Sequence, residues 1–263
     1  KPIVAIYSTF LQRGFDQVIH DVALEELDVV FAIDRAGLVG GDGATHQGVF
    51  DLAYLRAIPN LEIGMPRDAE QMRSMVKAAL ELGGPKAVRW PRGSVEAASD
   101  AGPDDWMPIE WGTAEVLKEG TEAWILALGP MVDYALEAAA DDARIGVVDA
   151  RFVKPLDEEL LLRLAKSGAL LVTVEDHNLP GGFGSAVAEA LADAGVNAPL
   201  LRLGVPDVVV PHGDPKRQHE ELGYGPEGIR QAVLSRIDGE ASMPIDAGNR
   251  TSDSQAFEAD VVK

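Results

Sequence analysis

The sequence contains no cysteine, which excludes disulfide bonds, thiol catalysis and thiolate-bound metal ions. It also contains no apolar run approaching the roughly 20 residues that a helix needs to span a bilayer. A chain without cysteine is typical of a reducing compartment, so a cytoplasmic location is the expectation.

Positive charge is also scarce in this chain. There are 23 lysines and arginines against 43 aspartates and glutamates, and the formal net charge is −20. An excess of this size repels the phosphates of nucleic acids and the surface of anionic membranes. Binding of an anionic substrate would therefore require a local cluster of arginines within an acidic protein.

The remaining composition, 46% hydrophobic and 25% charged over 263 residues, is that of a globular protein with room for two domains. Short apolar runs alternate with amphipathic stretches, which favours an α/β fold with two doubly wound, mostly parallel sheets. Strands are expected at 3–7, 29–33, 61–65 and 87–90, and then at 113–117, 123–128, 145–149, 169–174 and 200–203.

Several local signals refine this pattern. Residues 8–13 should form a loop, in which Ser8 or Thr9 can cap the following helix, and that helix should continue to about residue 20. Asp68 and Asp157 should each stand at the start of a helix. The strands at 113–117 and 123–128 should flank a turn at 118–120.

Composition also suggests the domain boundaries. The first domain is expected at 1–95 and the second at 109–237, joined by a linker at 96–108 that is rich in Asp, Gly and Pro. The polar, unpatterned tail at 238–263 is expected to be disordered. Because Lys1 and Pro2 lead directly into a core strand pattern, we expect the chain to begin inside its first domain.

The segment 34–48, DRAGLVGGDGATHQG, places Arg35, Asp42 and His46 among five glycines directly after a buried strand pattern. Glycine lets the backbone turn tightly and lets a ligand come close. Arginine binds carboxylate or phosphate through a fixed fork, and histidine can transfer a proton near neutral pH. A loop of this composition at the end of a strand is where an α/β protein places its chemistry.

Other strands of the first domain also end in side chains suited to a site. Tyr7 ends the first strand, Phe10 and Arg13 follow it, and Arg92 follows the fourth strand. The carboxyl ends of parallel strands meet at one edge of a sheet, so these side chains should converge on the glycine-rich segment. Arginines with a tyrosine suit a phosphate, a histidine beside them suits proton transfer, and an exposed Phe10 suits stacking on a flat heteroaromatic ring.

Three blocks of the sequence, YSTFLQRGFDQVIHDVA, DRAGLVGGDGATHQGVFDLAYLRAIPN and AVRWPRG, resemble the 1-deoxy-D-xylulose-5-phosphate synthases. These enzymes belong to the transketolase-like thiamine diphosphate family. The GDGxTHxG core indicates the wider family, whereas YSTFLQR and DRAGLVG narrow the resemblance to the synthases. It extends from Lys1 to about Ile237, with the blocks in the same order and spacing.

The resemblance implies a partial pyrimidine-binding domain followed by a transketolase-type C-terminal domain. It implies a transferase that decarboxylates pyruvate and passes the two-carbon unit to glyceraldehyde 3-phosphate, giving 1-deoxy-D-xylulose 5-phosphate for isoprenoid, thiamine and pyridoxal synthesis. The family uses thiamine diphosphate and Mg²⁺. Their diphosphate and metal sites, with the activating glutamate, belong to a portion that would precede this chain. An N-terminal fragment of the same enzyme is therefore an expected partner, within a homodimer.

The resemblance also assigns roles on the cofactor side of the site. Phe10 would stack on the aminopyrimidine and bind the cofactor. Arg13 would face the pyrimidine or the carboxylate of pyruvate, and it counts among the catalytic candidates. No metal ligand is expected in this chain.

On the acceptor side, the resemblance implies that Tyr7, Arg35 and Arg92 hold the phosphate of glyceraldehyde 3-phosphate. Asp42 and His46 would hydrogen-bond its hydroxyl and carbonyl groups. They are the other two catalytic candidates, and His46 would assist proton transfer as the aldehyde oxygen becomes an alkoxide.

Two other classes of function stay open. A transketolase or a 2-oxo-acid dehydrogenase β subunit belongs to the same wider group of enzymes. A non-catalytic interaction module could keep the fold without the chemistry. Such a module would be marked by the loss of the chemically active side chains, whereas Arg35, Asp42, His46 and Arg92 are all present.

The remaining polar clusters are expected to be structural. The glycines of 181–184 lack the spacing of a dinucleotide fingerprint and are interpreted as a helix entry. Glu175, Asp176 and His177 follow a strand and cannot easily all face one ion, so a structural or interfacial role is predicted. His212 and His219, in a charged loop, are expected to be solvated.

Overall fold

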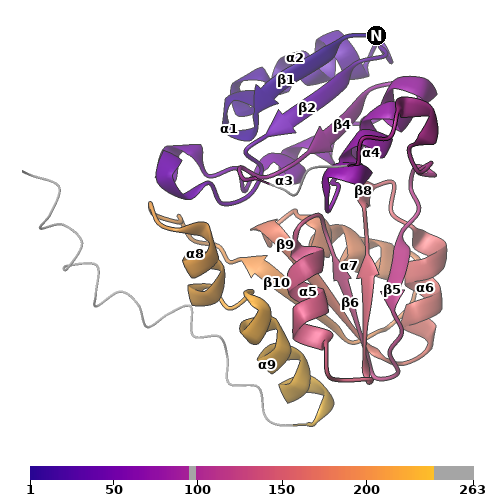
Figure 1. Ribbon diagram of the computed structural model, residues 1–263, viewed down its shortest axis with the longest axis vertical. Coiled ribbons are helices and arrows are strands. Elements are labelled where there is room, and N and C mark those ends of the chain that lie inside the picture. Colours follow the sequence, from indigo (N-terminus) through magenta and orange to yellow (C-terminus); the bar gives the residue numbers. More distant parts are fainter. Residues whose placement is uncertain (95–98, 240–263) are drawn as a thin grey trace, which may run out of the picture.

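The computed structural model describes residues 1–94 and 99–239. Its strands form two five-stranded sheets, drawn one above the other in Figure 1. The expected α/β class with two mostly parallel sheets is confirmed. The expected tail from residue 240 onward, and the linker residues 95–98, lie outside the described residues.

The first sheet has the order β1-β2-β4-β3-β8. Its strands are β1 (Ile3–Tyr7), β2 (Val30–Asp34), β4 (Lys86–Arg89), β3 (Glu62–Gly64) and β8 (Phe152–Lys154). The first four strands run parallel, and β8 pairs antiparallel with β3.

The second sheet has the order β10-β9-β6-β7-β5. Its strands are β10 (Leu200–Val205), β9 (Leu170–Asn178), β6 (Ala123–Ala127), β7 (Ile145–Asp149) and β5 (Glu115–Lys118). Only β5 is antiparallel to its neighbour, β7.

Helices lie between most of these strands along the chain, although β6 follows β5 and β8 follows β7 directly. In the first half they are α1 (Ser8–Leu11), α2 (Phe15–Gln17), α3 (Asp51–Leu55) and α4 (Ala69–Leu82). In the second half they are α5 (Met131–Ala139), α6 (Glu158–Lys166), α7 (Phe183–Asp193), α8 (Pro215–Glu221) and α9 (Pro226–Ile237). No helix within 1–94 and 99–239 has the length and apolar character needed to cross a bilayer.

Two helix starts are as the sequence predicts. The Asp68 carboxylate accepts the N–H of Gln71 at 2.7 Å, and the Asp157 carboxylate accepts the N–H of Leu160 at 2.9 Å. Each aspartate thus satisfies one of the free N–H groups in the first turn of its helix.

The prediction of a loop at 8–13 followed by one continuous helix to about residue 20 is wrong, because helical turns begin already at Ser8. Ser8 is already the first residue of α1, and neither Ser8 nor Thr9 caps it through its side chain. The segment passes from α1 through a 3₁₀ turn (Gln12–Gly14) and α2 to a π-helical turn (Val18–Ala23). Gly14 has φ −97° and ψ 8°, outside the helical region, because glycine resists helical conformations.

The strands expected at 113–117 and 123–128, on either side of the turn at 118–120, do not pair with each other. β5 pairs with β7, and β6 lies between β7 and β9. All five residues of β6 are buried, whereas every residue of β5 is only partly buried. The fully apolar strand therefore takes a central place in the sheet, and the half-polar strand takes the edge.

The short strand β8 was not expected from the sequence. Although it lies beyond residue 109 in the chain, it completes the first sheet beside β3. Phe152 of β8 is buried against Gly64 of β3, where a Cβ atom would lie 3.0 Å from the phenyl ring. The second half of the chain thus contributes a strand to the first sheet.

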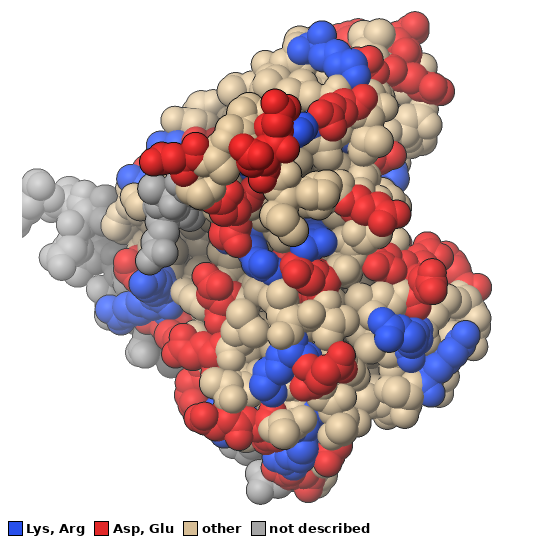
Figure 2. All heavy atoms as spheres, turned by 45° about the vertical axis from the view of Figure 1, so that its right-hand side comes forward, with Lys and Arg blue, Asp and Glu red and all other residues tan. Residues whose placement is uncertain are grey.

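The two halves of the described chain, residues 1–94 and 99–239, also share a hydrophobic core. One buried cluster includes Ile33 and Leu52 from the first half together with Leu171 and Phe183 from the second. On the face shown in Figure 2, acidic side chains spread over both halves with basic ones scattered among them. The shared core places the end of β9 against the glycine-rich segment of the first half.

Candidate active site

The candidate site lies where β1, β2 and β4 end. These strands are neighbours and run parallel, with Tyr7 opposite Asp34 and Ile33 opposite Arg89 in the register. Their carboxyl ends therefore meet at one edge of the sheet, as predicted.

The glycine-rich segment forms a closed loop at this edge. Gly37 and Gly48 exchange two backbone hydrogen bonds of 2.7 Å, which join the ends of the loop. Two 3₁₀ turns, Gly40–Asp42 and Ala44–His46, follow each other inside it. Gly43, between them, has φ 86°, a conformation that L side chains rarely adopt.

Arg35 is fixed at the start of this segment. Its Nε donates to Oδ2 of Asp42 at 2.7 Å, and its Nη1 donates to Oδ2 of Asp34 at 3.1 Å. Its guanidinium carbon lies 3.9 Å from the centre of the Tyr7 ring. The backbone of Arg35 is left-handed, with φ 57°, which is costly for a residue with a side chain and is common at functional sites.

Arg92 approaches the same carboxylate from the end of β4, with its Nε 3.5 Å from Oδ2 of Asp42. The hydrogen bond from Arg35 holds the pKa of Asp42 below its ordinary value, and the charge of Arg92 adds to this effect against the opposing effect of burial. Asp42 is therefore an ionised carboxylate between two guanidinium groups.

Aromatic rings form the other side of the site. The Tyr7 and Phe10 rings stack with centroids 5.2 Å apart, and the His46 ring meets Phe10 edge-on at 5.7 Å. Phe10 nevertheless remains 53% exposed, which is unusual for a phenylalanine beside other rings. An exposed aromatic face at the carboxyl edge of the sheet fits a flat heteroaromatic ring such as a pyrimidine.

Six of the seven predicted site residues are thus brought together; they are Tyr7, Phe10, Arg35, Asp42, His46 and Arg92. Arg13 differs from them. It is exposed on the 3₁₀ turn Gln12–Gly14 and, within the described part of the chain, makes no hydrogen bond or ion pair with the other six. Its role stays a prediction.

The acidic run Glu175–His177 lies inside β9, not after it as the sequence suggested. All nine residues of β9 are buried. No group of three or more His, Asp or Glu side chains in 1–94 and 99–239 is arranged to hold a metal ion. Charged residues that follow a strand cannot be distinguished, from the sequence alone, from charged residues inside a strand. The latter are possible only when distant segments provide hydrogen-bond partners, and the sequence does not show these.

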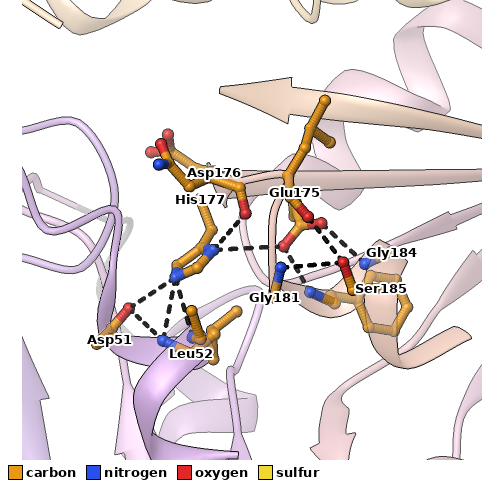
Figure 3. Close-up of polar contacts among 12 residues, drawn as sticks. Asp51, Leu52, Glu175, Asp176, His177, Gly181, Gly184 and Ser185 are labelled. Atoms are coloured by element: carbon orange, nitrogen blue, oxygen red, sulfur yellow. Dashed lines mark hydrogen bonds and ion pairs between the residues drawn. The ribbon is translucent and has the colours of Figure 1, made fainter. Parts of the chain in front are cut away.

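Glu175 caps helix α7 from within the strand (Figure 3). Its two carboxylate oxygens accept the N–H groups of Phe183 at 2.6 Å and Gly184 at 2.8 Å. Burial raises the pKa of Glu175 to about 7, although these hydrogen bonds oppose the shift. A Cβ atom at Gly182 would lie 2.2 Å from this carboxylate. The glycines of 181–184 are therefore a helix entry with close packing, as predicted.

His177 lies against the first half of the chain (Figure 3). Its Nε2 accepts the N–H groups of Leu52 at 3.1 Å and Ala53 at 3.4 Å, at the start of α3. Its Nδ1 donates to the carbonyl of Asn178 at 2.7 Å. These contacts require a neutral ring with its proton on Nδ1, and burial lowers the pKa of His177 to about 4.

A buried ion pair lies beside this histidine. Arg89 at the end of β4 donates from Nε and Nη2 to the two carboxylate oxygens of Asp51, both at 3.0 Å. Neither side chain is exposed. The pair holds the start of α3 against β4, and His177 holds it against β9.

The prediction that His219 is solvated is wrong, whereas His212 is exposed as expected. His219 is 5% exposed because it lies on α8, a helix that the sequence pattern did not reveal. Its Nδ1 lies 3.2 Å from the Tyr134 hydroxyl and its Nε2 lies 3.4 Å from Oδ2 of Asp176.

Comparisons with known proteins give a consistent result. Residues 1–97 match the transketolase pyrimidine-binding domain, and residues 112–229 match the transketolase C-terminal domain. The chain is 60% identical over 235 residues to a 1-deoxy-D-xylulose-5-phosphate synthase of Thermus thermophilus, and 49% identical over 262 residues to that of a Synechococcus species. These matches cover 89% and 98% of this chain but only 37% and 39% of the relatives.

Solved structures agree with this result. A split-gene transketolase, described as an inactive β4 tetramer, aligns with a TM-score of 0.77 and 34% identity, over 90% of this chain and 76% of that one. A Pichia stipitis transketolase in complex with sedoheptulose 7-phosphate aligns with a TM-score of 0.70 over 90% of this chain and 34% of its own. At 19% identity, the second likeness concerns the fold alone.

Proposed function

The chain belongs to the transketolase family, as the pyrimidine-binding and C-terminal domains of a 1-deoxy-D-xylulose-5-phosphate synthase, and from this we propose that it forms the acceptor side of that enzyme's active site. The enzyme would decarboxylate pyruvate and transfer the two-carbon unit to glyceraldehyde 3-phosphate. The observation that carries the proposal is the cluster of Arg35, Asp42 and Arg92 beside Tyr7 and His46.

The phosphate of the acceptor would bind between Arg35 and Arg92, with the Tyr7 hydroxyl as a further donor. Guanidinium groups suit this role because they present several N–H donors in one plane. Two nearby carboxylates, Asp34 and Asp42, balance the two arginines in the free protein, so this cluster has no net charge until the substrate arrives.

Asp42 and His46 would act on the aldehyde end of the acceptor. Asp42 is ionised and can accept a hydrogen bond from a substrate hydroxyl. The Nδ1 of His46 lies 3.0 Å from the Thr45 hydroxyl, which leaves Nε2 to give a proton to the aldehyde oxygen as the new C–C bond forms.

Phe10 would hold the aminopyrimidine ring of thiamine diphosphate by stacking, which its exposed face permits. Arg13, on the same helical segment, would face the pyrimidine or the pyruvate carboxylate. When bound, the cofactor supplies the acidic carbon and the electron sink that loss of CO₂ from pyruvate requires. The diphosphate and Mg²⁺ would be held by residues that precede this chain in the family's proteins.

The proposal includes an N-terminal fragment as partner, within a homodimer in the cytoplasm. The first support is that the chain spans under two fifths of its curated relatives. The second is the edge strand β1, where Ile3, Val4 and Ala5 are exposed. Parallel strands are normally covered on both faces, so a partner segment packed on β1 would cover these exposed side chains.

Reconstitution tests the proposal. The 263-residue chain is assayed alone and mixed with an N-terminal polypeptide that carries the diphosphate-binding domain, with pyruvate, glyceraldehyde 3-phosphate, thiamine diphosphate and Mg²⁺. Formation of 1-deoxy-D-xylulose 5-phosphate only in the mixture is the expected result. Product from the chain alone would exclude the need for a partner. Transfer from a ketose donor, or activity that depends on lipoamide, would assign the chain to one of the other enzyme types.

A further inference from the structure

The glycine-rich loop 37–48 is held by the second half of the chain. Figure 1 shows it beside the end of β9 and the segment that leads into α8. The N–H of Asn178 in β9 donates to the carbonyl of Val49 at 3.0 Å, directly after the loop closes. The loop therefore lies against residues that are far from it in the sequence.

Asp176 of β9 is a buried residue that contacts the loop. Its side chain is 5% exposed, and Oδ2 accepts the N–H of Leu38 at 3.0 Å. Oδ1 accepts the Tyr224 hydroxyl at 3.0 Å, and Nε2 of His219 lies 3.4 Å from Oδ2. Burial opposes the charge, yet these polar partners keep the pKa of Asp176 below its ordinary value. A buried carboxylate is thus directed at the loop backbone.

The loop is shaped for this contact. Gly37 has φ 84°, and a Cβ atom there would lie 2.1 Å from Oδ2 of Asp176. Gly40 has φ 58°, and a Cβ atom there would lie 2.6 Å from Cδ of Pro215, the first residue of α8. Side chains at these two positions would push the loop away from the second half.

Gln47 forms a second, independent connection. It is 4% exposed, and its Oε1 accepts the N–H of Val39 at 2.8 Å. Its Nε2 donates to the carbonyl of Pro211 at 3.0 Å. One side chain thus joins both arms of the loop to the segment before α8.

Asp42 and His46 lie between these attachment points. Within the described residues, neither makes a hydrogen bond or ion pair with the second half. We propose that Asp176 and Gln47 are positioning residues, through which the C-terminal domain holds Asp42 and His46 in place for the acceptor aldehyde. The attachment of the loop rests on the contacts alone, whereas its effect on the acceptor aldehyde rests on the proposed function.

The attachment is tested first without any activity, on the chain as it is. Amide hydrogen exchange is measured for residues 37–48 in the wild type, Asp176→Asn and Gln47→Ala. The matched control is Asp149→Asn, since Asp149 is a fully buried carboxylate of the same sheet that contacts Gln71 and Arg67 instead. At least a tenfold faster exchange of the loop amides is expected in both test variants and not in the control.

The consequence is tested in the reconstituted enzyme. A displaced loop should raise KM for glyceraldehyde 3-phosphate about 10- to 100-fold, since small misplacements of reacting groups are costly. CO₂ release from pyruvate without an acceptor and KM for pyruvate should stay within about twofold. A purely structural role would instead lower the thermal midpoint and reduce all rates together, as expected for the control. Gln47→Ala covers the case in which Asp176→Asn does not fold.

Each result is decisive. Unchanged exchange in the loop would overturn the attachment, whatever the enzyme does. Faster exchange with an unchanged KM for glyceraldehyde 3-phosphate would overturn the positioning role. If the wild-type mixture makes no product, the proposed function fails, while the exchange data still decide whether the loop is attached.

Discussion

Nε of Arg35 and Oδ2 of Asp42 lie 2.7 Å apart, so the arginine proposed to bind phosphate already has a carboxylate partner. A phosphate would have to share or displace this contact. Asp42 thus limits anion binding in the free protein. When the phosphate replaces Asp42 as the partner of Arg35, the Asp42 carboxylate becomes available to the substrate.

Replacing Asp42 with Asn separates these two effects. Removal of one negative charge between the two guanidinium groups should strengthen binding of inorganic phosphate to the chain, by roughly fivefold. Product formation in the reconstituted enzyme should fall, because the hydroxyl of the acceptor loses its charged acceptor group. Calorimetric titration with phosphate measures the first effect. Asp133→Asn, an exposed acid on α5, is the control, and weaker phosphate binding in Asp42→Asn would contradict the arrangement.

Replacing Arg35 with Met should affect one substrate selectively. Loss of a charged phosphate contact is expected to cost about 2 kcal/mol in transition-state binding, or about thirtyfold in kcat/KM for glyceraldehyde 3-phosphate. The rate of CO₂ release from pyruvate alone should change little. Arg217→Met, at an exposed arginine of α8, is the matched control. An equal loss for both substrates would mean that Arg35 supports the fold of the site and not the acceptor.

Much of this arrangement follows from the sequence for a physical reason. Strands of the first half are separated by helices, so they run parallel and bring Tyr7, Arg35 and Arg92 to one edge whatever the details of the loops. Asp68 and Asp157 precede amphipathic stretches and act locally, each through the N–H group three residues further along the chain. Features that depend on neighbours in sequence could therefore be predicted.

Features that depend on residues far away in the sequence could not be predicted. β8 has only three residues, too few to show a period, and it is defined by its pairing with β3. His219 is buried because Tyr134 and Asp176, far away in the chain, surround it. Glu175 and His177 can lie inside a strand because the starts of α7 and α3 satisfy their polar atoms.

The buried pair of Asp51 and Arg89 should be costly to break from one side. Asp51→Leu leaves an uncompensated guanidinium with no exposure, and the expected loss is about 3–5 kcal/mol in the free energy of unfolding. The double variant Asp51→Leu, Arg89→Met should lose less than the single one, since no buried charge remains. Urea unfolding of the chain measures both. Glu221→Gln breaks an exposed pair with Arg217 and should cost under about 0.5 kcal/mol.

Glu175 and His177 should impose opposite pH dependences on stability. The pKa of Glu175 rises from 4.5 to about 7 on folding, so the folded state keeps its proton longer and stability falls as pH increases from 4.5 to 7. The pKa of His177 falls from 6.5 to about 4, so the unfolded state takes up the proton first and stability increases with pH from 4 to 6.5. In the wild type the two effects largely cancel between 4.5 and 6.5.

Single substitutions should therefore reveal the pH dependence of the unfolding free energy that each group contributes, which cancels in the wild type. The difference in unfolding free energy between wild type and His177→Gln should grow with pH over 4 to 6.5, and the difference for Glu175→Gln should shrink with pH over 4.5 to 7. Each change should reach about 3 kcal/mol, from about 1.36 kcal/mol per pKa unit. Unpaired N–H groups at Leu52 or Phe183 add a cost that does not depend on pH, so only the slopes are diagnostic. Urea unfolding across this pH range measures them, and parallel curves for all three proteins would show that neither group changes its pKa on folding.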